Sequence, residues 1–167
     1  MIFAENLTAA IEEKWTEGRY PSLRSWLGAT PSVNRTQVAD HWLELIGTKI
    51  GQQLDQRDFQ GVVNQMIHRA ASACIREAAE PVLIYQCFAL QESKVQQLQA
   101  DLADFHARLG SPATLWFYVL QTPAELKKEF ESVLKQADQS AALPAAEIRA
   151  ALNRGSRFVN ERLIAIG

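Results

Sequence analysis

Three histidines are the side chains in this sequence best able to bind a metal or move a proton, and they lie at His41, His68 and His106. Each falls on a different predicted helix, and no two have the spacing of four residues that places two ligands on one helix face. His41 and His106 adjoin the apolar residues Trp42 and Phe105. Isolated histidines on helix flanks are usually structural, so we expect neither a metal site nor an acid–base centre.

The two cysteines, Cys74 and Cys87, lie in apolar segments, and burial makes a thiol a poor nucleophile. Two cysteines are also too few for a disulfide framework, which favours a reducing compartment and predicts a cytoplasmic protein. The phosphate-binding motifs GxxxxGK[ST] and GxGxxG and the zinc motifs HExxH and CxxC are absent from the sequence. Ser132 and Lys135 match S-x-x-K in letters alone. The sequence therefore predicts a protein that is not an enzyme and holds no cofactor or metal.

The charge balance gives no reason to expect nucleic acid as a partner. The 167 residues carry a net charge of −2 with a pI near 5.9, so no basic excess draws the chain toward phosphates. Locally, Arg154 and Arg157 flank Gly155 and are candidates for contact with an anion or with an acidic partner surface. No membrane association is expected, because no segment has the roughly 18 apolar residues of a span and the N-terminus lacks the basic region of a signal peptide.

Aromatic residues are the remaining candidates for a binding function. Four of them lie in two apolar runs of the chain: Tyr85 and Phe88 in VLIYQCFAL, and Trp116 and Tyr118 in ATLWFYVL. Such side chains line pockets for flat apolar ligands, and they also anchor protein interfaces. The sequence thus leaves open a sensor domain with an internal aromatic pocket and a protein-interaction module.

The secondary structure of these two runs decides the fold. An α/β or α+β fold takes them as strands near 82–90 and 114–121, separated by a helix with the spacing of a βαβ unit. Such a sheet needs a third strand, because two strands alone are marginal. The best remaining segment, 158–166, is interrupted by Asn160, Glu161 and Arg162. The lack of a clear third strand counts against the sheet.

A regular heptad favours helices instead. Apolar residues alternate at spacings of three and four along Val95, Leu98, Leu102, Phe105 and Leu109. Extending the pattern backward reaches Phe88 and Ile84 in the same phase. This predicts one continuous helix from Pro81 to Leu109, about 43 Å long at 1.5 Å per residue. The predicted fold is therefore an all-α multi-helix bundle with one long central helix.

The rest of the chain is also predicted to be helical. Helices are expected over 7–17, from Asn34 to about residue 54, from Asp58 to about residue 75, and over 112–121 and 123–138. Leu23, Trp26 and Leu27 should form one amphipathic turn that packs over the core. Gly47 and Gly51 either allow a close helix–helix approach or are glycines tolerated on the helix surface. The whole chain, 1–167, is expected to be a single helical domain with a short helical appendage at about 144–167.

These observations predict a non-enzymatic interaction or regulatory module that self-associates through helix packing, as a homo-oligomer or with a protein partner. The expected interface is the heptad together with the aromatic run after it: Val95, Leu98, Leu102, Phe105, Leu109 and Trp116. The alternative is the sensor domain, whose pocket would be lined by Tyr85, Phe88, Trp116 and Tyr118.

Overall fold

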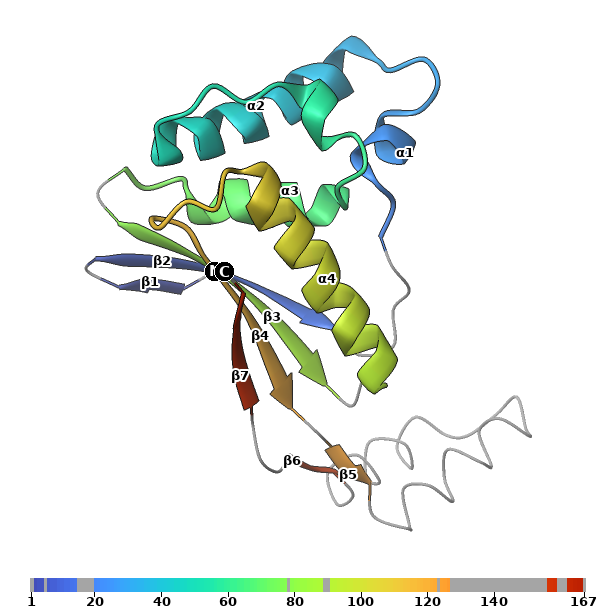
Figure 1. Ribbon diagram of the computed structural model, residues 1–167, viewed down its shortest axis with the longest axis vertical. Helices are drawn as coiled ribbons and strands as arrows, with labels where there is room; N and C mark the ends of the chain where they lie inside the picture. The colour runs from blue at the N-terminus through green and yellow to red at the C-terminus, as the bar shows by residue number, and fades with distance from the viewer. Residues whose placement is uncertain are drawn as a thin grey trace, which may run out of the picture.

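A computed structural model describes residues 2–4, 6–14, 20–77, 79–88, 91–122, 124–126, 156–158 and 162–166 (Figure 1). Its strands are β1 (Ile2–Ala4), β2 (Leu7–Lys14), β3 (Glu80–Phe88), β4 (Trp116–Thr122), β5 (Ala124–Leu126), β6 (Ser156–Phe158) and β7 (Arg162–Ile166). Its helices are α1 (Leu23–Leu27), α2 (Val33–Ile50), α3 (Asn64–Ala73) and α4 (Glu92–Arg108), with a 3-10 turn η1 (Gln56–Phe59).

Five strands form one mixed sheet in the order β1-β2-β3-β4-β7. The three central strands, β2, β3 and β4, are parallel, whereas β1 and β7 lie antiparallel at the two edges. β5 and β6 form a separate antiparallel pair. Parallel neighbours need a crossover connection, and here α1, α2 and α3 connect β2 to β3 while α4 connects β3 to β4.

The described helices lie on one side of this sheet. Both crossovers step in the same direction, from β2 to β3 and from β3 to β4, and right-handed crossovers in one direction place their helices on one face. Accordingly, α3 packs on β2 and β3, and α4 packs on β4 and β7. α2 lies further out, against α3 (Figure 1). The opposite face of the sheet carries none of these helices.

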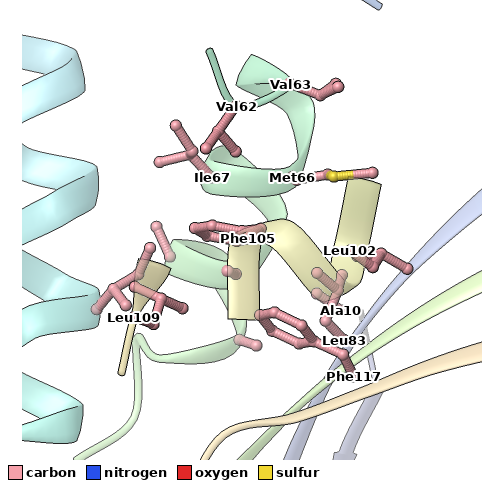
Figure 2. Close-up of a cluster of buried hydrophobic side chains, with 14 of the residues drawn as sticks. Ala10, Val62, Val63, Met66, Ile67, Leu83, Leu102, Phe105, Leu109 and Phe117 are labelled. Atoms are coloured by element: carbon pink, nitrogen blue, oxygen red, sulfur yellow. The ribbon is translucent and has the colours of Figure 1, made fainter. Parts of the chain in front are cut away.

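The hydrophobic core lies between the sheet and the helices (Figure 2). Ala10, Leu83 and Phe117 come from three neighbouring strands and point toward Leu102 and Phe105 of α4. The rings of Phe105 and Phe117 stack with centroids 5.4 Å apart. All five side chains are buried, so the inner face of the central strands and the heptad of α4 form one core.

The prediction of an all-α bundle is wrong, because the first apolar run is the central strand β3. It pairs with β2 on one side and β4 on the other, and a central parallel strand is typically a continuous apolar run. Ile84 and Phe88 share a helix face because they are four residues apart, but four residues are also two strand periods. Their agreement in phase with the heptad therefore did not distinguish a helix from a strand. The heptad itself is helical, as α4.

The other segments predicted as helices also require correction. The run at 112–121 contains β4, and the segment 7–17 contains β2, which is the third strand that the α+β alternative lacked. Residues 156–158 and 162–166, predicted as helix, are β6 and β7. β7 tolerates interrupted hydrophobicity because it lies at the sheet edge, with Ile164 and Ile166 packed on the core and Leu163 exposed.

Several helical predictions are confirmed. Leu23 and Leu27 of α1 are buried, with Trp26 packed against the core, as expected of the amphipathic turn. The helix expected from Asn34 is α2, although Ser32 caps it. The helix expected from Asp58 begins only at Asn64, after η1. The predicted helix at 123–138 includes β5, and both its remainder and the first part of the predicted appendage, up to residue 155, lie outside the described residues. Within the described part of the chain, no helix has the length and apolar character of a membrane span.

Candidate functional site

The heptad residues predicted as an interface are mostly inside the fold. Val95, Leu102, Phe105 and Leu109 are each 0% exposed and contact residues of their own chain. Leu98 is partly buried at the margin of the core. Trp116 differs from these, since 46% of it is exposed on the first residue of β4. Of the predicted interface, only Trp116 is substantially available to a partner.

The four residues predicted to line an internal pocket lie on two faces of the sheet. Tyr85 is buried on the face that the helices cover. The strand pairing places Phe88, Trp116 and Tyr118 on the opposite face, because Val82 pairs with Trp116 and alternate residues of a strand point the same way. The structure therefore separates Tyr85 from the other three aromatic residues.

The side chains of the two arginines predicted to contact an anion lie outside the described part of the structure. Arg154 lies outside the described residues, and Arg157 is described only through its backbone, which pairs with Glu125. The three histidines are placed separately, with His41 exposed on α2, His68 partly buried on α3 and His106 buried on α4. Across the described ranges, no three His, Cys, Asp or Glu side chains gather as metal ligands would.

The face of the sheet that the helices leave uncovered, called here the open face, is largely apolar. Pairing across β2, β3, β4 and β7 aligns its residues in rows, such as Ile11, Ile84 and Tyr118. Two large apolar side chains on it are markedly exposed, Leu163 at 59% and Trp116 at 46%. The apolar residues of the open face are Leu7, Ala9, Ile11, Val82, Ile84, Phe88, Trp116, Tyr118, Leu120, Leu163 and Ala165, and its charged and polar residues include Glu13, Glu80 and Gln86.

A group of charged side chains lies on the covered face, where the sequence predicted none. Glu12 and Lys14 on β2 are both 7% exposed, and Arg69 comes from α3 above them. Glu12 accepts a hydrogen bond at Oε2 from Nε of Arg69 over 2.6 Å, and its Oε1 is 3.5 Å from Nζ of Lys14. The side chains of Glu12, Lys14 and Arg69 are called here the charged cluster.

Two tyrosine rings enclose the charged cluster. The ammonium group of Lys14 lies 3.5 Å from the ring centroid of Tyr20 and 5.9 Å from that of Tyr85. An ammonium over an aromatic face is attracted by the ring quadrupole, most strongly when it is desolvated. Burial, and then the carboxylate of Glu12, raise the pKa of the Tyr85 phenol, so this hydroxyl remains protonated. It is fully buried, and no described residue forms a hydrogen bond with it.

An aromatic stack leads outward from the cluster along the helices. His68, next to Arg69, stacks on Trp42 with centroids 4.8 Å apart, and Trp42 contacts Trp26 at 5.2 Å. Burial lowers the pKa of His68 below its usual value, the positive charge of Arg69 lowers it further, and Glu12 opposes both. His68 is therefore uncharged near pH 7. Its Nδ1 lies 3.2 Å from the side-chain amide oxygen of Gln65.

The cysteines are buried, as the sequence predicted. Burial raises the pKa of the Cys74 thiol to about 12, with a smaller opposing effect of Lys49. Burial also raises the pKa of Cys87 to about 11, against the charge of Lys14. Neither thiol is poised as a nucleophile, because the thiolate is disfavoured in both cases.

A polar cleft of about 530 Å³ lies away from this cluster, between α2 and η1. Its two carboxylates already have partners. Asp40 accepts a hydrogen bond from the amide of Gln56, and Asp55 forms an ion pair with Arg57. Hydrogen bonds from Arg57 lower the pKa of Asp55 to about 2. Both carboxylates of the cleft therefore already accept hydrogen bonds, and that of Asp55 is also paired with a cation.

A family model described as a domain of unknown function (DUF6946) matches residues 1–117. The chain belongs to this family. The matched segment runs from β1 to the second residue of β4, so it includes the charged cluster and the heptad of α4. No curated protein and no solved structure matches the chain.

The charged cluster could not be predicted once the segment 7–17 was expected to be a helix. In a helix Glu12 and Lys14 point away from each other, whereas residues two apart in a strand share a face. The sequence of β2, LTAAIEEK, shows no alternation of apolar and polar residues that could have located them. Arg69 carried no sequence signal, since only the packing of α3 brings it to β2.

Proposed function

We propose that this domain is a non-enzymatic interaction module that forms a homodimer through the open face of its sheet. One observation carries the proposal: Trp116 and Leu163 are exposed to 46% and 59% on a face whose central residues are apolar. Large exposed apolar patches on proteins commonly mark binding surfaces. The partner surface thus differs from the helix packing expected from the heptad.

A second copy of the chain is the occupant that suits this face best. The two central rows of the open face, Ala9–Val82–Trp116 and Ile11–Ile84–Tyr118, contain no charged side chain, so the same apolar surface of a second copy complements them, while Glu13 lies in the next row. Two sheets pack face to face about 10 Å apart with their strands within roughly 30°. A twofold axis would bring the same patch of both copies together, which is the commonest arrangement of oligomers.

The size of the face predicts a weak dimer. The face spans four strands about 4.8 Å apart, and about five residues of each strand, at about 3.3 Å per residue, contribute to it. These dimensions give the face an area of roughly 300 Å² per copy. Stable complexes bury about 1,200–2,000 Å² in total, and smaller interfaces are typical of transient association. We therefore expect reversible dimerisation that depends on protein concentration. The free buried cysteines suit a reducing compartment, and we place the protein in the cytoplasm.

Sedimentation equilibrium over a wide concentration range tests this proposal. Leu163→Glu places a charge on the open face and should abolish dimerisation. Ile75→Glu is the matched control, because Ile75 is equally exposed at 59% but follows α3 on the helical side. It should dimerise as the natural sequence does. A natural chain that stays monomeric at the highest concentrations, or equal loss of dimer in both variants, would refute the proposal.

A further inference from the structure

The charged cluster has more hydrogen-bond donors than its acceptors can serve. Lys14 offers three N–H groups, and Arg69 offers two further nitrogens beyond Nε. Among the described residues, the acceptors bonded to them are the two carboxylate oxygens of Glu12, Oε2 to Arg69 and Oε1 to Lys14. The contact of Lys14, at 3.5 Å, is at the outer limit of a hydrogen bond. The imbalance leaves donors that an additional acceptor would satisfy.

The hydroxyl of Tyr85 is a second, independent sign of such an acceptor. Tyr85 is 1% exposed, and its oxygen has no partner among the described residues. Strand pairing places it directly beside Glu12 on the covered face. Because it remains protonated, it is a donor, and a buried polar group without a partner costs about 1–3 kcal/mol. A chain normally satisfies such a group, so its persistence here points to a ligand.

The net charge of the cluster sets the sign of that ligand. Two cations face one carboxylate, and Lys14 and Glu12 are almost fully buried. Buried charges are ordinarily paired, because an isolated one is costly in a medium of low dielectric constant. The three side chains of the cluster therefore carry a net charge of +1. An anion would balance this charge.

The position of the cluster also suits ligand binding. Lys14 is the last residue of β2, and Tyr85 lies in the second half of β3, so the group sits toward the carboxyl ends of two parallel strands. The side chain of Arg69 is 34% exposed, which provides an approach from solvent, whereas the ring of Tyr20 covers Lys14.

We propose that the charged cluster and the Tyr85 hydroxyl bind a small ligand through an oxyanion group, either a phosphate or a carboxylate. The oxyanion accepts hydrogen bonds from Nζ of Lys14, from the terminal nitrogens of Arg69 and from Oη of Tyr85. Glu12 holds both cations in position through its two oxygens. This site is independent of the open face, since it lies on the other side of the sheet.

Thermal unfolding and titration calorimetry with inorganic phosphate and with acetate test the proposal, each compared with chloride at equal ionic strength. At least one of the two anions should raise the unfolding temperature of the natural chain and bind measurably. Tyr85→Phe removes only the unpartnered hydroxyl, so the variant should fold at least as stably but bind that anion about tenfold more weakly. Tyr118→Phe, on the opposite face, is the matched control and should bind normally.

A second pair of variants tests the cationic part of the site. Lys14→Met should lose anion binding, while Lys94→Met, on an exposed position of α4, should keep it. If Lys14→Met does not fold, Tyr85→Phe still decides the question. A response to phosphate alone identifies a phosphate ligand, and a response to acetate alone identifies a carboxylate. The proposal is overturned if neither anion binds, or if Tyr85→Phe binds as the natural chain does. Dimerisation through the open face is measured separately and stands or fails by itself.

Discussion

The Oε2 atom of Glu12 and the Nε atom of Arg69 are 2.6 Å apart, although the two residues are separated by 57 positions in the sequence. This ion pair joins the central strand β2 to the helix α3 that covers it. The carboxylate of Glu12 also contacts Lys14, so this one buried side chain interacts with two cations. Glu12 is therefore the residue on which the polar part of an otherwise apolar interface depends.

Replacing Glu12 by Gln should destabilise the protein by about 1–3 kcal/mol. The change removes the negative charge but keeps the shape, and it leaves Lys14 and Arg69 without a counterion. The partial exposure of Arg69 to solvent limits the loss. Urea denaturation measures the free energy of unfolding. Glu13→Gln is the control, because Glu13 is the next residue, is exposed and faces the other side of β2; an equal effect of both variants would contradict this role of Glu12.

The protonation of His68 should make the protein less stable below about pH 6.5. Burial and the charge of Arg69 hold the pKa of His68 below its ordinary value of 6.5, which the unfolded chain retains. Between the two pKa values the unfolded state binds more protons, so the free energy of unfolding falls as the pH falls. Above pH 6.5 this contribution is complete.

The difference between the natural chain and His68→Gln isolates this effect from other titrations. The stability advantage of the natural chain should shrink as the pH is lowered through 6.5, as measured by urea denaturation at a series of pH values. His41→Gln, at an exposed position of α2, provides the comparison. A constant difference between the natural chain and His68→Gln over this range would show that His68 is not responsible.

Substitution of Gly47 by Ala should destabilise the protein by about 1–3 kcal/mol, despite the better helix propensity of alanine. A Cβ atom at Gly47 would lie 2.4 Å from the backbone oxygen of Gln52, which is too close without movement of the chain. The close approach expected at this glycine therefore exists, but with the segment after α2. Gly61→Ala has open space and should change the unfolding free energy by less than about 0.5 kcal/mol. Stabilisation by Gly47→Ala would disprove the steric argument.

Alkylation should distinguish the native from the unfolded state at both cysteines. Their pKa values of about 12 and about 11 keep Cys74 and Cys87 protonated at about pH 8, and both are buried. Iodoacetamide should therefore modify neither in the folded protein and both in urea, as followed by mass spectrometry. Rapid modification of either cysteine under native conditions would show that its surroundings open more readily than the structure indicates.

The sequence was most informative where local pattern and tertiary packing agree. The heptad from Val95 to Leu109 predicts a helix, and it is one, because its apolar stripe packs on the sheet with a period that any helix must follow. The turn of Leu23, Trp26 and Leu27 was predicted for the same reason. The burial of the two cysteines also followed from their apolar surroundings.

The strands were harder to recognise because a central parallel strand leaves no distinct period. β3 is apolar on both faces, so its residues fit a buried helix equally well. β2 was misread for a different reason. Its charged residues Glu12 and Lys14 point toward the helices, where they find partners that are distant in sequence, and this reverses the usual rule that charges face solvent.

The sequence by itself determined which segments are apolar, where the heptad of α4 lies and that four common phosphate-binding and zinc motifs are absent. Only the tertiary structure decided that the two apolar runs are neighbouring strands, and that the heptad packs within its own chain. It also decided that Arg69 and Tyr85 meet Glu12 and Lys14. The physical reason is that strand pairing and buried ion pairs join residues far apart along the chain, whereas sequence periodicity reports only on neighbours within a few turns.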